Sequence, residues 1–178
     1  MEHLLRWARG SASWGGILTV LYNVVMQSNL FFQYCQKLII LSADHQSVLL
    51  AKRKGEADYD GTHSFIGGKM ETTDETLITS MQREKDEEIG PDAVVKILPN
   101  ESYNILFRKK DGNSMIVPHI AGIFVSGTIA ISEEYSDYQW VPLVKLDAFE
   151  PKIANIPELT KWAVNKLAIA SIDQFVRI

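Results

Sequence analysis

The sequence has 178 residues, of which 46% are hydrophobic and 22% charged, so it is long and apolar enough to bury the core of one globular domain. Its formal net charge of −4 gives no basic face of the kind that attracts duplex nucleic acid, although a single nucleotide remains an acceptable ligand. The single cysteine, Cys35, excludes a disulfide framework and a Cys-rich zinc site. We therefore expect a cytoplasmic protein with a small-molecule partner, and we leave the oligomeric state open, with a homodimer as one alternative.

Residues 1–30 differ in composition from the rest of the chain. Two arginines precede the apolar stretch GGILTVLYNVVM, which is the order found in signal peptides. No small-residue cleavage site follows, and the apolar part is shorter than the ~20 residues that a membrane span needs. We interpret this region as an extension of the main domain at 31–178, either dispensable before a second start at Met26 or packed on the domain as a helix. Membrane insertion or export is the less favoured alternative.

The main domain is predicted to begin with two strands. Strands at 37–42 and 47–52 carry the apolar runs LIIL and VLLA, and a short turn at 43–46 joins them. The stretch GEADYDGTH that follows is a loop by composition. A helix is predicted at 76–89, because this segment is rich in good helix formers and a Gly-Pro pair ends it.

More strands and a last helix are predicted beyond this point. The segment 102–127 has the pattern of a β-hairpin, with an Asp-Gly dipeptide at its turn, and 138–143 is another short strand. The final helix is predicted to begin near Pro157, with Asn155 as the candidate cap. This order of elements predicts a mixed α/β domain in which helices pack on a sheet.

The helix at 76–89 places its acids in an unusual position. At ~100° per residue, Glu84 and Glu88 continue the stripe that begins with Leu77 and Met81, and Glu87 lies to one side of both. Acids of a solvated helix normally lie opposite the apolar stripe. Grouped carboxylates that are partly buried need a cation, and oxygen ligands suit Mg²⁺ or Mn²⁺. The alternative is an ordinary charged helix end, in which neighbouring basic residues neutralise these acids.

A glycine pair precedes this helix. Gly67 and Gly68 allow the backbone to turn sharply or to approach a ligand closely. A loop that leads into a helix can also direct N–H groups at an anion. The pair therefore favours the metal and anion site over the charged helix end.

The stretch GGKMETTDETLITSMQREKDEEIG resembles the signature of the Nudix hydrolases. That signature is a glycine, five residues, Glu, seven residues, Arg-Glu, two residues, Glu-Glu, one residue and Gly. Seven residues separate Glu75 from Arg83-Glu84, two more precede Glu87-Glu88, and Gly90 follows after one residue. The resemblance extends over roughly residues 37 to 147.

Two departures from the signature bear on the site. Six residues separate Gly68 from Glu75, one more than the signature has. We interpret this as an insertion before Glu75, because that choice preserves the whole helix; the alternative gives Asp74 the position of the glutamate and shifts the helix register. The family usually has an aliphatic residue where Lys85 stands, which alters the packing expected there.

The resemblance implies a fold and a chemistry. The fold would be an α/β/α sandwich with a mixed sheet and a loop–helix metal site. The activity would be hydrolysis of a nucleoside diphosphate linked to another moiety, by attack of water on phosphorus with Mg²⁺ or Mn²⁺. The metal ligands would be Gly68, Glu84, Glu87 and Glu88. Arg83 would pair with Glu75 and tie the loop to the helix.

The remaining site residues are assigned less directly. The general base is left open between Glu84 and two later loop acids, Glu133 and Glu134, of which we take Glu134 as a catalytic candidate. Arg53 is expected to contact phosphate, together with the backbone of Gly67 and Gly68. Further candidates for phosphate contact are Lys54, Arg108 and Lys109. Candidates for stacking on a nucleobase are Tyr59, His63, Phe65, Tyr103 and Phe107.

Two other functions are weighed against hydrolysis. A Nudix-like module that senses a nucleotide without cleaving it would be expected to lack one or more helix glutamates, and this chain keeps them. The isomerase branch of the same fold needs a cysteine deep in the pocket, and Cys35, ahead of the first core strand, is expected to lie elsewhere. The sequence gives no indication of which moiety is linked to the diphosphate.

Overall fold

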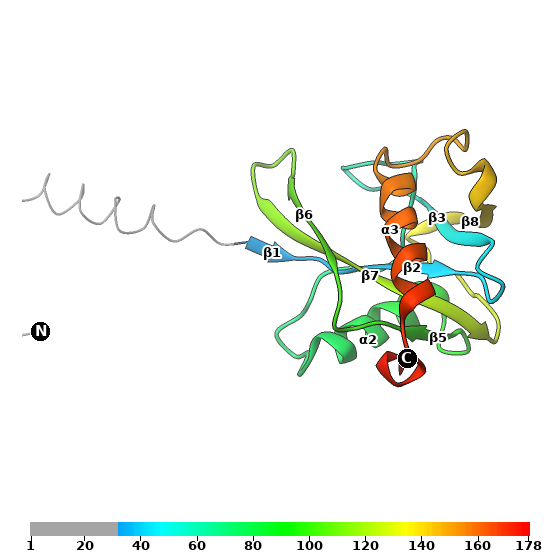
Figure 1. The fold of residues 1–178 in the computed structure, drawn as a ribbon. Coiled ribbons are helices and arrows are strands. Elements are labelled where there is room, and N and C mark those ends of the chain that lie inside the picture. Colours follow the sequence, from blue (N-terminus) through cyan, green and yellow to red (C-terminus); the bar gives the residue numbers. More distant parts are fainter. Residues whose placement is uncertain (1–31) are drawn as a thin grey trace, which may run out of the picture. The chain divides into compact units, whose positions relative to one another are not determined.

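The computed structural model describes residues 32–178, so the predictions for residues 1–30 lie outside the described residues. The described part is a mixed sheet with one long helix on each face (Figure 1). The helices are α2 (Leu77–Ile89) and α3 (Ile156–Ile169), with short 3-10 helices at Leu143–Lys145 and Ile172–Gln174. The strands are β1 (Phe32–Tyr34), β2 (Lys37–Leu41), β3 (Ser47–Arg53), β4 (His63–Ser64), β5 (Val94–Ile97), β6 (Tyr103–Arg108), β7 (Ser114–Ser126), β8 (Tyr135–Pro142) and β9 (Val176–Arg177).

The long strand β7 organises the sheet. Its first half pairs with β6 in antiparallel and with β1 in parallel orientation, and its second half pairs with β2 in parallel and with β5 in antiparallel orientation. From β2 the sheet continues through β3 to β4, and β8 also pairs with β3. The first half of β7 therefore belongs to a three-stranded ribbon, β1–β7–β6, that extends from the main sheet.

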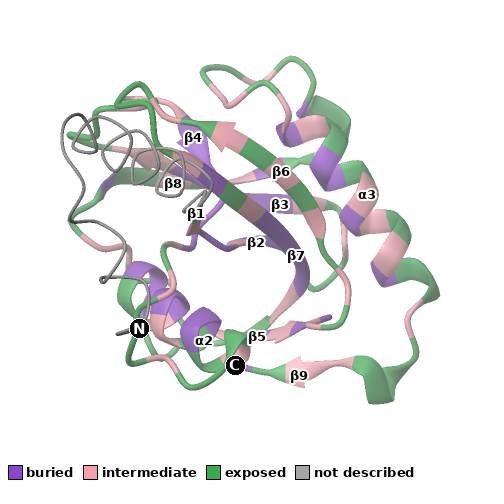
Figure 2. Ribbon diagram, turned by 90° about the vertical axis from the view of Figure 1, so that its left-hand side faces the viewer, coloured by how far each residue is buried: buried purple, intermediate pink, exposed green. Residues whose placement is uncertain are grey.

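The apolar run of β2 explains why both faces of the sheet are covered. Leu38 and Ile40 pack into the core beneath α2, whereas Ile39 and Leu41 pack into the core beneath α3. Successive side chains of a strand point to opposite faces, so an uninterrupted apolar run is stable only when both faces are covered. Figure 2 shows the two helices on opposite sides of the buried strands. The predicted α/β/α sandwich with a mixed sheet is confirmed.

Helix α2 begins and ends where the sequence predicts. The Thr76 side chain accepts a hydrogen bond from the Thr79 N–H at 3.1 Å, and the Thr79 hydroxyl accepts one from the Thr76 N–H at 3.0 Å. This reciprocal capping satisfies two backbone donors that a helix start otherwise leaves open. Gly90, at a φ of +89°, ends the helix.

Lys85 takes the place of the expected aliphatic residue without leaving a charge unpaired. Its side chain is 2% exposed, and its Nζ donates to the Ala93 carbonyl at 2.9 Å and pairs with Asp86. A buried ammonium is tolerated when it is paired and hydrogen-bonded. The lysine therefore fastens the end of α2 to the residue that precedes β5.

The other predicted elements are present with small changes of boundary. The hairpin has its turn at the predicted Asp-Gly dipeptide, and β8 begins three residues earlier than predicted because it pairs with β3 as far as Tyr135. Asn155 is the N-cap residue of α3, but its side chain makes no capping hydrogen bond. Strands β1, β4, β5 and β9 are too short for the sequence pattern to have indicated them.

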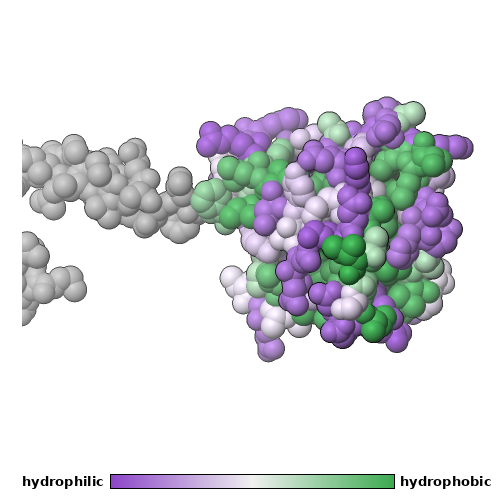
Figure 3. All heavy atoms as spheres, viewed as in Figure 1, coloured by the Kyte–Doolittle hydropathy of each residue, from purple (hydrophilic) through white to green (hydrophobic). Residues whose placement is uncertain are grey.

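The surface over α3 mixes hydrophilic residues with small apolar areas (Figure 3). Among the helices of residues 32–178, none is long and apolar enough to cross a membrane.

Candidate active site

A cavity of about 530 Å³ lies between the glycine loop and the β1–β7–β6 ribbon. One end is acidic and is lined by Glu84, Glu87 and Glu88 of α2. The other end is mainly apolar; its lining includes Phe65, Ile105, Phe107, Met115, Val117, Ile153 and Ile156. A volume of this size suits a small-molecule ligand.

Strand alternation builds the apolar end. On β6, Ile105 and Phe107 are half-buried and line the cavity, whereas Leu106 between them is 67% exposed. The paired strand β7 repeats the pattern, with Met115 and Val117 on the cavity side. One face of the ribbon is thus a wall of the cavity.

Glu88 is the most confined of the three helix acids. It is 5% exposed, and its carboxylate accepts hydrogen bonds from the Gly67 N–H and, at 2.9 Å, from the Tyr135 hydroxyl. Burial raises the pKa of the Glu88 carboxyl, while the Lys37 charge and these two donors act to lower it. The glycine loop and β8 therefore fix the orientation of this carboxylate.

Glu84 packs directly on the glycine loop. A Cβ atom added at Gly68 would overlap the Glu84 carboxylate, so a larger residue at that position would displace this side chain. Burial raises the pKa of Glu84, the Arg83 hydrogen bond lowers it, and repulsion from Glu88 and Glu87 raises it further. This site thus holds close like charges that a cation would stabilise.

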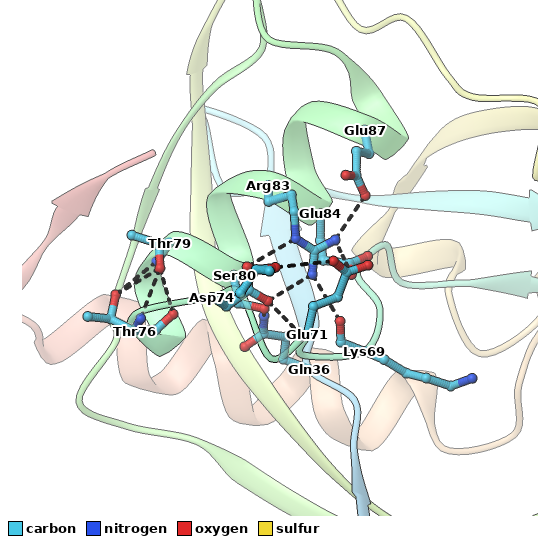
Figure 4. A network of polar contacts seen from close by, with 11 residues as sticks. Gln36, Lys69, Glu71, Asp74, Thr76, Thr79, Ser80, Arg83, Glu84 and Glu87 are labelled. Carbon is cyan, nitrogen blue, oxygen red and sulfur yellow. Dashed lines mark hydrogen bonds and ion pairs between the residues drawn. The ribbon is translucent and has the colours of Figure 1, made fainter.

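Arg83 links the loop to the helix through an extended network (Figure 4). Its Nε and Nη2 atoms donate to the Asp74 carboxylate at 3.1 and 3.0 Å, and Nη2 also donates to the Lys69 carbonyl at 3.0 Å. Its Nη1 atom lies 2.9 Å from Glu84 and 3.0 Å from Glu87. Only a guanidinium offers enough donors in a planar fork for such a set of partners.

The predicted pairing of Arg83 with Glu75 is wrong, because Asp74 is the partner and Glu75 is exposed. Five residues separate Gly68 from Asp74, as the signature requires of its acid. Glu84 and Glu88 still face the glycine loop. The additional residue is therefore accommodated between Asp74 and Arg83 and not before Glu75, and the acids of the helix keep their orientation.

The three helix acids do not converge on one point. Glu87 is exposed, and within residues 32–178 no three His, Cys, Asp or Glu side chains are close enough together to hold a metal ion. The Arg83 Nη1 atom contacts both Glu84 and Glu87. The Gly68 carbonyl accepts a hydrogen bond from the Gln36 N–H at 2.9 Å, which leaves it a second lone pair.

Other predicted residues divide into those that line the cavity and those that do not. Glu134 and Arg53 line it, and Glu133 does not. Arg53 pairs with Glu56, but its Nε atom is buried without a partner, as is the Ser64 hydroxyl on the same wall. Among the other basic and aromatic candidates, the cavity is lined by Lys109, Tyr59, Phe65 and Phe107.

The remaining candidates have structural contacts elsewhere. The Nδ1–H of His63 donates to the Pro151 carbonyl at 2.8 Å, and its ring packs on Phe149 with ring centroids 4.8 Å apart. Tyr103 packs on Trp162, and its hydroxyl bonds Glu158 at 2.6 Å. Their assignment to nucleobase stacking is therefore wrong, and Lys54 and Arg108 likewise do not line the cavity.

Cys35 is placed differently from the expectation. It lines the cavity because it forms an isolated bridge with Lys69 of the glycine loop. Burial raises the pKa of its thiol, which disfavours the reactive thiolate. The sequence position ahead of β2 gave no indication of this long-range pairing.

His119 is the buried titratable group at the apolar end. Burial lowers its pKa to about 4, so the ring is neutral near pH 7. Its Nδ1 atom lies 3.2 Å from the Tyr103 carbonyl, to which the neutral ring donates from this nitrogen. Neither His119 nor Tyr135 belongs to a sequence motif, so the sequence does not indicate that either residue lies at the site.

A model of the NUDIX domain matches residues 37–163 of the chain. The chain belongs to the NUDIX family. The predicted resemblance is thereby confirmed, and this NUDIX protein is a Nudix hydrolase by family. The comparison with curated proteins returned no similar sequence.

Solved structures share the fold of this NUDIX protein at low sequence identity. A MutT protein from Methanosarcina mazei Go1 is 21% identical with a TM-score of 0.62, over 80% of this chain and 99% of that one. The NUDIX domain of Shewanella oneidensis NrtR, complexed with ADP ribose, is 19% identical with a TM-score of 0.63, over 84% and 97%. A C. elegans Ap4A hydrolase is 15% identical with a TM-score of 0.57, over 76% and 95%.

Proposed function

We propose that this NUDIX protein hydrolyses a nucleoside diphosphate linked to another moiety, of the nucleoside triphosphate or nucleotide sugar class, with Mg²⁺ or Mn²⁺. The observation that carries the proposal is the pair of buried carboxylates, Glu84 and Glu88, at one end of a cavity whose other end is apolar. Acids alone would repel a diphosphate, so a cation must mediate the contact. Two structural neighbours support a nucleotide-type ligand: the NrtR domain is complexed with ADP ribose, and the C. elegans protein is an Ap4A hydrolase.

The donor types suit a hard divalent cation, which Glu87 would join by turning away from Arg83. Glu84, Glu87 and Glu88 supply carboxylate oxygens, and Gly68 supplies a carbonyl oxygen, which are the ligand types that Mg²⁺ and Mn²⁺ prefer. The raised pKa values of Glu84 and Glu88 indicate negative charge that protein groups compensate only in part. When bound, the metal would neutralise phosphate oxygens and lower the pKa of water.

The chain's own residues would orient the ligand. Arg53 would donate to a phosphate from the wall that also carries the unpaired Ser64 hydroxyl. The apolar side chains of the ribbon would exclude water from a nucleobase. Arg83 would hold Glu84 and Glu87 in place through its anchor on Asp74. Glu134, which lines the cavity beside Glu88, would accept the proton from the attacking water.

The assignment of the base is tested by two neighbouring acids. Both Glu133 and Glu134 are exposed, but only Glu134 lines the cavity. Glu134→Gln is expected to lower kcat by roughly 10²-fold, the usual contribution of a general base, without changing the melting temperature. Glu133→Gln is the matched control and should retain full activity. Full activity of both variants would exclude both loop acids and leave Glu84 as the candidate base.

The reaction itself is tested with a substrate panel. We would incubate the wild-type protein with nucleoside triphosphates, nucleotide sugars, ADP-ribose and dinucleotide polyphosphates, with Mg²⁺, Mn²⁺ or excess chelator, and separate the products. Cleavage of at least one class is expected with metal, and none with chelator. If no compound is cleaved but one raises the melting temperature, the protein is a nucleotide-binding module and the hydrolase proposal fails.

A further inference from the structure

Lys37 is a cation of the cavity that the mechanism above does not use. It is the first residue of β2 and is half-buried. Its partner in the register is His119 of β7, so the two side chains project from the same face of the sheet. Both residues line the cavity.

The other half-buried cations of this cavity have anionic partners within the chain. Arg53 pairs with Glu56, Lys109 pairs with Asp111 at 2.8 Å, and Arg83 pairs with the acids described above. Within residues 32–178, Lys37 forms no ion pair and its ammonium group makes no hydrogen bond. An ammonium that has lost part of its hydration is expected to gain from an anionic partner.

Lys37 lies between the glycine loop and the apolar end, because its Cα atom is close to Gly67 and its partner in the register is His119. Its charge lowers the pKa of Glu88 at the acidic end. It also lowers the pKa of His119 at the apolar end, and that of Cys35. A ligand that extends from the apolar end to the acids would therefore run past Lys37 on the cavity wall.

We propose that Lys37 is a phosphate-binding residue, whose ammonium group contacts the phosphoryl group next to the nucleoside. This rests on the proposed function in so far as the ligand carries a nucleotide. In this arrangement the nucleobase lies at the apolar end and the distal phosphates lie at the acids. The first phosphoryl group then lies between them, near the Lys37 ammonium group. A lysine provides a compact point charge with rotatable donors, which suits a phosphate oxygen.

The competing role is charge balance within the protein. If Lys37 serves only to offset Glu84 and Glu88, its removal would change how tightly the protein binds a metal ion, but not how it binds a phosphate in the absence of metal. The two roles are therefore separated by a ligand that carries one phosphate and is measured under chelation.

The test compares nucleoside monophosphates with the matching nucleosides by titration calorimetry, in excess chelator. Lys37→Met should weaken binding of the preferred monophosphate by about tenfold or more, and leave the nucleoside affinity unchanged. Lys37→Arg keeps the charge and should retain most of the affinity. Lys52→Met is the control, because Lys52 is also half-buried, on the adjacent strand β3, but does not line the cavity.

Two results would overturn the proposal. One is a monophosphate affinity of Lys37→Met equal to that of the wild type. The other is a wild-type protein that binds no monophosphate of any base more tightly than its nucleoside. Neither result depends on turnover, so the two proposals can fail separately. If no substrate is cleaved but phosphate binding depends on Lys37, the hydrolase proposal fails and the phosphate site stands. If a substrate is cleaved but phosphate binding does not depend on Lys37, the hydrolase proposal stands and the phosphate site fails.

Discussion

Replacing Glu88 with glutamine is expected to lower kcat by about 10³-fold while leaving the protein folded. The carboxylate is held by the Gly67 N–H and by Tyr135, and its negative charge is what a divalent cation would bind. Loss of such charge stabilisation costs several kcal/mol in the transition state, and ~4 kcal/mol corresponds to about 10³ in rate. Activity with Mg²⁺ and the melting temperature with and without Mg²⁺ would both be measured.

The melting temperatures separate a metal ligand from a structural residue. Without metal, Glu88→Gln should melt at or above the wild-type temperature, because burial already disfavours the charge, as the raised pKa shows. The stabilisation that Mg²⁺ gives the wild type should disappear in the variant. Glu75→Gln, at an exposed acid just before the same helix, should behave as wild type in both measurements. A Glu88→Gln variant with more than about a tenth of the activity would remove Glu88 from the metal site.

The second large effect is expected at Gly67, and it concerns stability. Gly67 has a φ of +109°, and an added Cβ would lie 2.5 Å from the backbone oxygen of Gln36. The Gln36 oxygen and the next nearest atom, the Cα of Lys37, belong to the backbone, so neither can rotate away from the added Cβ. Gly67→Ala should therefore lower the free energy of unfolding by about 2–4 kcal/mol, which urea denaturation would measure.

The neighbouring glycine provides the contrast. At Gly68 the added Cβ would meet the Glu84 carboxylate, a side chain that can move. Gly68→Ala should thus cost less stability than Gly67→Ala, but it should displace Glu84 and reduce activity strongly. If Gly68→Ala kept full activity, the close packing of Glu84 on the loop would have no part in the chemistry.

The sequence was sufficient where a local pattern decides the structure. The run LIIL predicts a strand whatever it pairs with, and the helix-forming residues and the Gly-Pro stop predict the bounds of α2 within one residue. The spacing of Glu84 and Glu88 placed both on the inner face of α2, and both are buried. These features depend on residues within two or three turns of each other.

The sequence was insufficient where a distant segment supplies the partner. The path of the loop between Gly68 and α2 determines that Arg83 meets Asp74, and spacing alone did not distinguish Asp74 from its neighbour. Tyr135 and Cys35 reach the site through strand pairing across the sheet. The cytoplasmic location, the homodimer and the role of residues 1–30 stay predictions.

The division of β7 has a consequence for how such a protein could diversify. Residues 114–118 of β7 pair only with β1 and β6 and form the wall of the apolar end, whereas the part from His119 onward pairs with β2 and β5 in the core. Exchanging the inward side chains of the hairpin would reshape the surface that, in the proposed function, meets the nucleobase of a ligand. The acids and glycines lie on other elements, so new selectivity could be grafted onto an unchanged reaction centre.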